Sequence, residues 1–344
     1  MNEIAIKAYA KINLCIDVLG KRPDGYHEIL TVMEQIDLFD LVTVSWTEGN
    51  KDVCISLKSN KPFLPTDNRN IAYKAAELMI NRYGREIGVR GIAEITDITD
   101  IADKEDRHKE TPEGNIETPE KDIQKFSRID INIEKRIPVS AGLAGGSANC
   151  AAVIHALNRL WNLNLDLKTL MEIGTELGAD VPFCLAGQAA LNEHLMLSND
   201  TLASTCALAS GIGEKLEPLP PLKAMVLLSK PPISVSTAQV YGGLDFLNIK
   251  EHPNVQELIA GIRENNYYKI TKNMINVLED YSLKAYPVIT DTKDKIIRAG
   301  GAAKVLMSGS GPTVFGLYKN KKKGKAAFDK LKKIDFETYL VKTL

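Results

Sequence analysis

The chain has 344 residues, with 43 Lys and Arg against 44 Asp and Glu, so its formal net charge is −1. A nearly neutral chain lacks an electrostatic footprint for nucleic acid or an anionic membrane surface, and we expect neither as a partner. No apolar run approaches the roughly 20 residues that span a bilayer, and the first residues do not resemble a signal peptide. Five scattered cysteines without a CxxC pair predict reduced thiols and a cytoplasmic protein.

The first 60 residues predict β-structure. Apolar side chains alternate over 4–10, and a second apolar run follows over 12–19. The stretch KRPDGYH at 21–27 predicts a turn, because proline and Asp-Gly favour a tight change of direction. Two short strands are expected at 41–46 and 53–57, around a polar turn.

The next segments predict a helix, an insertion and a strand. One apolar stripe over 70–83 indicates a helix, and strict alternation over 128–133 indicates a half-buried strand. Between them, 97–125 contains ETPE twice and few apolar residues. Such a segment cannot offset its ordering entropy by burial, so we expect a mobile, acidic surface insertion, with a docking tail as the alternative.

The remaining elements mix helices and strands without a strict βαβ repeat, which predicts an α+β fold and not a Rossmann sheet. Capping residues and apolar periodicity place their boundaries. The expected elements are helices at 147–161 and 166–177, a strand at 223–228, a helix capped by Ser236 or Thr237, and hairpin strands at 303–307 and 313–318.

The stretch PVSAGLAGGSANCAA, which begins at Pro138, joins an expected strand to an expected helix. Glycines let backbone N–H groups approach a ligand, and a helix N-terminus attracts anions. Ser147 is placed to cap the helix or to reach a phosphate or its magnesium. The stretch matches neither a Walker A loop nor G-x-G-x-x-G, so phosphate binding and tight backbone packing both stay open.

Three further features could carry chemistry. Lys11 interrupts an apolar strand, and it is either an edge residue facing water or a buried, paired cation. Asp180 follows a helix exit in LGADVPF and is either a turn residue or a positioned base. SGSGP at 308–312 is a hairpin tip. Together with the glycine-rich stretch, they suggest phosphoryl transfer, which needs backbone donors, a cation and a proton acceptor.

These stretches resemble the GHMP kinases, a family named for galactokinase, homoserine kinase, mevalonate kinase and phosphomevalonate kinase. PVSAGLAGGSANCAA is similar to the family's ATP-phosphate motif and MSGSGPTVFG to its third motif. AYAKINLCIDVLGKRPDGYHEI, DNRNIAYKAA, LGADVPFCLAG, GIGEKLEPLP and KPPISVSTAQVY are most similar to members that phosphorylate a cytidine-diphosphate alcohol in isoprenoid precursor biosynthesis. The resemblance implies a ribosomal-protein-S5-like domain at 1–165, an α/β domain at 166–344, and an active site in the cleft between them.

The resemblance also implies roles for individual residues. Lys11 and Asp180 would be the catalytic pair, with Asp180 accepting the proton of the substrate hydroxyl. Asn13, Tyr26 and His27 would hold the small-molecule substrate, and the cofactors would be ATP and Mg²⁺, with Ser147 as a candidate magnesium contact. The implied ATP-binding residues are Asn70, Pro138, Val139, Ser140, Ala141, Gly142, Leu143, Ala144, Gly145, Gly146, Ser147 and Ala148.

The chain departs from the family pattern at several points. The 97–125 segment has no counterpart in a typical member, and a second apparent insertion, at 192–206, is expected to form a surface loop. Ser140 and Asn149 stand where Ala and Asp are commoner, but no glycine is lost. The alternatives are another GHMP kinase, such as homoserine kinase, or a non-catalytic nucleotide- or sugar-binding sensor. The DGYH stretch disfavours the first, and retention of both Lys11 and Asp180 disfavours the second.

Overall fold

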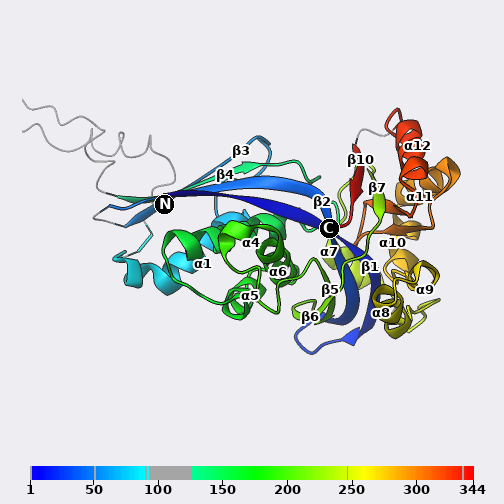
Figure 1. The fold of residues 1–344 in the computed structure, drawn as a ribbon, viewed down its shortest axis with the longest axis horizontal. Helices are drawn as coiled ribbons and strands as arrows, with labels where there is room; N and C mark the ends of the chain where they lie inside the picture. Colours follow the sequence, from blue (N-terminus) through cyan, green and yellow to red (C-terminus); the bar gives the residue numbers. More distant parts are fainter. Residues whose placement is uncertain (1, 50–51, 90, 93–125, 246, 335–336) are drawn as a thin grey trace, which may run out of the picture.

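The computed structural model describes residues 2–49, 52–89, 91–92, 126–245, 247–334 and 337–344. The insertion predicted at 97–125 lies outside the described residues. Two β-sheets, each covered by helices, lie at opposite ends of an elongated molecule (Figure 1). Among the described helices, none combines the length and the apolar composition that crossing a bilayer requires. The α+β class predicted from the sequence is confirmed.

A long antiparallel hairpin forms the spine of the first sheet. β1 (Glu3–Lys21) pairs with β2 (His27–Thr47), and the Arg22 N–H donates to the Tyr26 carbonyl across the predicted turn. The sequence divided β1 into two runs, but the structure has one strand with a register shift between Tyr9 and Ala10. Such a shift exchanges the faces of the strand without ending it. The strand expected at 41–46 is likewise only the last part of β2.

Both halves of β2 have further strand partners. One half pairs with β4, which itself pairs in parallel with β3, and the other half pairs with β5, which is followed by β6. The bounds are β3 Val53–Ser59, β4 Ser127–Glu134, β5 Cys206–Gly211 and β6 Lys215–Leu219. A strand shared by two sets of neighbours is buried along most of its length, and it can carry polar residues into the centre of the molecule.

Four helices pack on one face of the first sheet (Figure 1). Asp166 caps the third of them, as the sequence predicts, and Asn70, predicted as the first residue of its helix, is instead the N-cap of the first. They are α1 Ile71–Tyr83, α4 Gly145–Leu160, α5 Leu167–Thr175 and α6 Val181–Leu191. The division into domains at 165/166 stays a prediction. Elements beyond it, as far as β6, belong to this sheet and its helical layer.

The second sheet has the strand order β10-β7-β9-β8 and is antiparallel throughout. The predicted hairpin around SGSGP is β8–β9, and Ser236 caps α7 through a bond from the Gln239 N–H. The strands are β7 Met225–Lys230, β8 Lys304–Met307, β9 Val314–Tyr318 and β10 Glu337–Lys342. The helices are α7 Thr237–Gly243, α8 Val255–Arg263, α9 Tyr267–Asn273, α10 Glu279–Ala285, α11 Pro287–Ala299 and α12 Lys321–Leu331.

The prediction that 192–206 forms a surface loop is wrong at both ends of the segment. Asn192 and Leu195 are buried at its start, and Thr205 is buried near its end. The Asn192 side chain accepts from the Lys7 N–H at 3.1 Å and so completes the hydrogen bonding of β1. Only the middle of the segment, including the exposed Met196, behaves as a surface loop. The prediction failed because a polar, irregular stretch resembles a surface loop in the sequence even when a side-chain amide within it pairs with a strand.

Candidate active site

A cavity of about 840 Å³ lies where the glycine-rich stretch meets β1, β2, α6, α7 and the hairpin tip. That volume falls within the range of small-molecule sites. The cavity brings together residues that are far apart in the sequence. Of the predicted site residues, it is lined by Lys11, Asn13, Tyr26, His27, Asn70, Pro138, Val139, Ser140, Ala141, Gly142, Ala144, Gly145, Gly146, Ser147 and Asp180. Leu143 and Ala148 do not line it, because both are buried in apolar clusters.

The 138–148 loop leads directly into the start of α4. Ala144 is the N-cap at φ 56°, without a side-chain cap, and the Ala148 N–H makes the first helical bond, 2.8 Å to the Ala144 carbonyl. The amides of Gly145, Gly146 and Ser147 therefore have no partner within the helix, and the helix dipole adds positive potential there. Ser147 is already the third residue of the helix, so of the two roles considered from the sequence, capping the helix and reaching a phosphate or its magnesium, the first is excluded. Three free amides at the cavity form an anion-binding surface.

The glycines of this loop serve different purposes. Gly142 has φ +71°, and a Cβ there would lie 2.2 Å from the carbonyl oxygen of Ser308 on the hairpin tip. The Ser308 hydroxyl donates to the Gly142 carbonyl at 2.9 Å, so the two glycine-rich loops pack backbone to backbone. A Cβ on Gly146 would meet nothing closer than a methyl of Ile71 at 3.6 Å. Close packing therefore explains Gly142, while Gly146 leaves its side of the loop open.

Lys11 and Asp180 meet at the cavity wall. Lys11 is 4% exposed, and its Nζ donates to Asn13 Oδ1 at 2.8 Å and lies 3.5 Å from Asp180 Oδ2. Asn13 is held in turn by a bond to the Thr31 hydroxyl at 2.9 Å. Asp180 is the N-cap of α6 but makes no side-chain capping bond, and 37% of its side chain is exposed. A lysine held by its neighbours thus faces a carboxylate that can still accept a proton from a bound ligand.

Aromatic rings lie at another part of the cavity wall. The ring of Tyr26 is largely exposed, and that of His27 lies 5.2 Å from the ring of Tyr241 on α7. Burial and the nearby Lys21 lower the pKa of His27 below its ordinary 6.5. The imidazole is therefore neutral at pH 7 and offers one donor and one acceptor. This combination suits a planar heterocycle with its own donors and acceptors.

Comparisons with known proteins agree with this geometry. The GHMP kinases N terminal domain family matches residues 115–188, and the GHMP kinases C terminal family matches 252–336. A 4-diphosphocytidyl-2-C-methyl-D-erythritol kinase of Alkaliphilus metalliredigens is 40% identical over 100% of this chain and 97% of its own. The enzyme of the same name from Acetivibrio thermocellus is 39% identical, with 100% of both chains covered. The chain belongs to the 4-diphosphocytidyl-2-C-methyl-D-erythritol kinase family of GHMP kinases.

Solved structures give the same result at the level of the fold. A crystal structure of 4-(cytidine 5'-diphospho)-2C-methyl-D-erythritol kinase has a TM-score of 0.69 at 25% identity and covers 99% of both chains. A homoserine kinase from Cytophaga hutchinsonii has a TM-score of 0.63 at 19% identity, covering 100% of this chain and 95% of its own. The family resemblance predicted from the motifs is confirmed, and this chain is an ATP-dependent kinase.

Asn70 has a structural task in this GHMP kinase in addition to lining the cavity. Its Oδ1 accepts from the Ala72 N–H at 3.0 Å and caps α1, while its Nδ2 donates to the Pro65 carbonyl at 2.9 Å. Both polar ends of the side chain are therefore used within the protein. Asn70 shapes the cavity wall by fixing the 64–71 segment, and its second N–H and second oxygen lone pair remain for a ligand.

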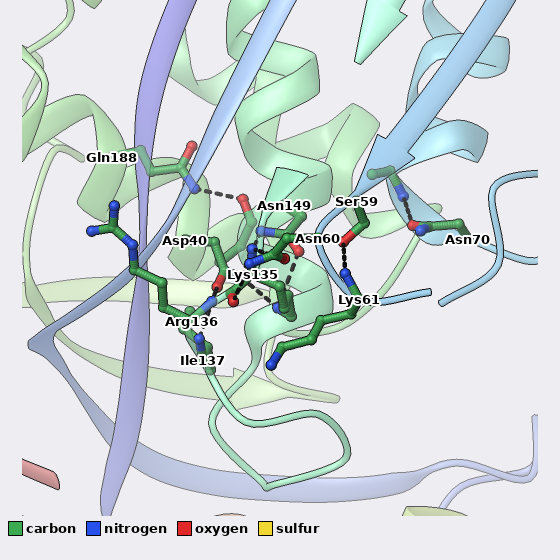
Figure 2. A network of polar contacts seen from close by, with 12 residues as sticks. Asp40, Ser59, Asn60, Lys61, Asn70, Lys135, Arg136, Ile137, Asn149 and Gln188 are labelled. Atoms are coloured by element: carbon green, nitrogen blue, oxygen red, sulfur yellow. Dashed lines mark hydrogen bonds and ion pairs between the residues drawn. The ribbon is translucent and has the colours of Figure 1, made fainter. Parts of the chain in front are cut away.

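Sequence reasoning missed a buried polar group behind the loop. Asp40 on β2, Lys135 after β4 and Asn149 on α4 form what we call the Asp40 cluster (Figure 2). Asp40 is fully buried and Lys135 is 5% exposed. Burial lowers the pKa of Lys135, and the charge of Asp40 opposes that shift. The one signal in the sequence is Asn149, which departs from the family pattern. Nothing in the sequence links it to a residue 109 positions earlier.

Tyr241 was also missed. It lies within the stretch KPPISVSTAQVY, which contributed to the family resemblance, but no single-residue signal distinguishes it from other helical aromatics. The structure places it on the cavity wall beside His27. Burial and the nearby Asp180 raise its pKa, so the hydroxyl stays protonated at neutral pH.

Proposed function

We propose that this protein transfers the γ-phosphoryl group of ATP to the C2 hydroxyl of 4-diphosphocytidyl-2-C-methyl-D-erythritol. The observation that carries the proposal is the Lys11–Asp180 pair, which shares one cavity with the free amides at the start of α4. Full-length relatives named for this substrate support the choice of acceptor. The reaction belongs to isoprenoid precursor biosynthesis, and we propose that it takes place in the cytoplasm.

We assign the polyphosphate of ATP to the 138–148 loop. The N–H groups of Gly145, Gly146 and Ser147 would donate to phosphate oxygens, and the helix dipole would stabilise their charge. The adenine would lie toward Leu64, Pro65 and the start of α1, which form the adjoining wall. Preorganised donors of this kind stabilise the negative charge of phosphoryl transfer without reorganisation of the site.

Asp180 would act as the general base. Its carboxylate accepts the proton of the acceptor hydroxyl while that oxygen forms a bond to Pγ, and the bond from Pγ to the bridging oxygen breaks to release ADP. Lys11 holds the carboxylate from 3.5 Å and places a positive charge beside the reacting oxygens. Asn13 fixes the ammonium through its 2.8 Å bond. Proton and phosphoryl group thus move in a geometry set by β1 and the start of α6.

The residues present suit a magnesium ion that arrives with ATP. Among the described residues that line the cavity, Asp180 is the only carboxylate, and no cluster of three metal-binding side chains is found in that part of the chain. Mg²⁺ is commonly held by one or two protein oxygens and by substrate phosphates, so the Ser147 hydroxyl would hold it together with the phosphates, and Asp180 stays free to act as the base. When bound, the ion would neutralise charge on the β- and γ-phosphates.

The acceptor's cytidine would occupy the aromatic part of the cavity. Tyr26 offers a ring face for stacking, and the neutral ring of His27 can hydrogen-bond the edge of a cytosine. Tyr241, beside His27, supplies a further aromatic surface. The methylerythritol end would then extend toward Asn13 and Asp180.

One assay tests the proposal. Purified protein with ATP, Mg²⁺ and 4-diphosphocytidyl-2-C-methyl-D-erythritol should release ADP and form a product phosphorylated at C2, identified by phosphorus NMR. Homoserine, mevalonate and galactose should give no ADP above the background without acceptor. ADP release with homoserine, and none with the cytidyl substrate, would replace the proposed acceptor by that of another GHMP kinase.

A further inference from the structure

The Asp40 cluster lies directly behind the 138–148 loop, and the proposed reaction gives it no task (Figure 2). Asp40 is fully buried, and its carboxylate pairs with the ammonium of Lys135. Buried ion pairs often contribute less to stability than apolar residues of the same volume would, because both charges must be desolvated. Stability alone is therefore a poor reason for this pair, and its geometry offers a better one.

The carboxylate of Asp40 holds both ends of the loop. Its Oδ1 accepts from the N–H groups of Arg136 at 2.7 Å and Ile137 at 2.8 Å, the two residues that precede the loop. Its Oδ2 accepts from Asn149 Nδ2 at 2.8 Å, on the residue that follows the loop. One rigid group on the central strand β2 thus fixes where the loop begins and where it ends.

Lys135 contacts the loop on the side that faces the Asp40 cluster. Its Nζ donates to Asn149 Oδ1 at 3.1 Å as well as to Asp40, so the ammonium is held by two partners. A Cβ built on Gly145 would lie 2.7 Å from this nitrogen. Gly145 is the first residue of α4 and the first of the three free amides. The ammonium of Lys135 therefore limits how closely the start of α4 can approach the Asp40 cluster.

We infer that the Asp40 cluster positions the loop for ATP: by fixing both of its ends and the depth of Gly145, it holds the three free amides in an arrangement that converges on a polyphosphate. The inference rests on the proposed placement of ATP at this loop. Asp40 is a positioning residue, since it acts through the backbone of the loop. Lys135 and Asn149, which also line the cavity, share that role by holding Asp40 and the start of α4. Errors of about 1 Å in such an arrangement reduce rates by up to roughly a hundredfold.

The test exchanges the two side chains that bridge the loop. In Asp40→Asn, the new amide Nδ2 faces the donors of Asn149 and Lys135, so we expect the Kd of ATP, measured by calorimetry, to rise at least about tenfold. The KM of the cytidyl acceptor should change less than about twofold, because its proposed contacts lie elsewhere. In the double variant D40N/N149D, the amide on β2 can donate to the carboxylate on α4, and Lys135 regains a carboxylate partner. Most of the ATP affinity should therefore return.

Several results would overturn the inference. One is ATP affinity in Asp40→Asn equal to that of the unaltered protein; another is equal loss of ATP and acceptor binding without recovery in the double variant, which would indicate general structural damage. If Asp40→Asn does not fold, Asn149→Ala decides, because it leaves Asp40 paired with Lys135. The inference then requires a several-fold higher Kd of ATP, and an unchanged Kd refutes it.

A separate variant tests the premise. Gly146→Val leaves the Asp40 cluster untouched and adds bulk on the open side of the loop, where a Cβ has no close neighbour. ATP binding should be lost in this variant. If Gly146→Val binds ATP normally, the nucleotide does not occupy the loop, and the placement of ATP fails independently of the cluster.

Discussion

Two lysine–aspartate pairs flank the glycine-rich loop, and they differ in what the aspartate is left free to do. Lys11 and Lys135 are almost equally buried. Asp40 accepts four hydrogen bonds in full burial, whereas the side chain of Asp180 is 37% exposed and, among the described residues, has one ion-pair partner, Lys11 at 3.5 Å. A carboxylate whose lone pairs are all used can fix a backbone but cannot accept a substrate proton. The sealed pair, Lys135 and Asp40, is therefore suited to fixing the backbone of the loop. The open pair, Lys11 and Asp180, is suited to accepting a substrate proton.

Replacing the open carboxylate should have the largest effect on turnover. Asp180→Asn removes the proposed base, so kcat should fall by about 10²–10⁴-fold. The melting temperature and the Kd of ATP should stay close to those of the unaltered protein, because Asp180 makes no capping bond and is partly exposed. Single-turnover kinetics and calorimetry measure the two effects. A kcat within about twofold of the original would remove Asp180 from the mechanism.

Replacing the lysine of each pair should lower the stability of the protein by different amounts. Lys135→Met leaves the carboxylate of Asp40 buried and without its counter-charge, so the free energy of unfolding should fall by about 3–5 kcal/mol. Lys11→Met leaves Asp180, which water can reach, and should cost about 1 kcal/mol. Urea unfolding of the two matched variants gives the comparison. An equal loss would mean that burial of the partner does not distinguish the pairs.

The glycines of the loop offer a smaller test. Gly142→Ala combines a left-handed φ with a Cβ 2.2 Å from the Ser308 carbonyl, so it should destabilise the protein by about 2 kcal/mol. Gly146→Ala is the matched control on the open side and should change stability by less than about 0.5 kcal/mol. Thermal unfolding of both variants measures the difference. Equal stability of the two would show that the contact between the loops contributes nothing.

Acceptor binding should depend on pH only below about 6.5. Because the pKa of His27 lies below 6.5, the neutral ring persists from high pH down to that value, and protonation below it removes the acceptor nitrogen. The KM of the cytidyl acceptor should therefore be constant from pH 8 to about 6.5 and rise several-fold below. His27→Gln, which cannot titrate, should abolish that rise. A KM that already increases above pH 6.5 would contradict the lowered pKa.

Local features were predictable where one short stretch contains all the determinants. Asp166 caps its helix, the apolar stripe over 70–83 forms a helix, and KRPDGYH forms its turn. The sequence failed where the partner is distant. Two apolar runs became one strand because β2 pairs along the whole of β1, and the 192–206 segment is partly buried because Asn192 bonds to Lys7.

The residues of the candidate site also divide into those that the sequence identifies and those that only the structure reveals. Lys11, Asp180 and the 138–148 loop were identified from motifs, since phosphoryl transfer demands those residue types. Their meeting at one cavity required the long β1–β2 hairpin and the start of α6. Tyr241 and Asp40 carry no local signal at all. Aromatic and acidic residues are common on helices and strands, and only their neighbours distinguish these two.

The sequence by itself therefore indicated the reaction class and supplied the candidates for the phosphate-binding loop and for the residues that move a proton. The tertiary structure alone decided which carboxylate is open and which is sealed. That difference depends on how many donors surround each oxygen, and for Asp40 those donors come from residues 95 to 109 positions away along the chain. Chemical identity is a property of a residue, but burial and hydrogen-bond saturation are properties of the packing around it.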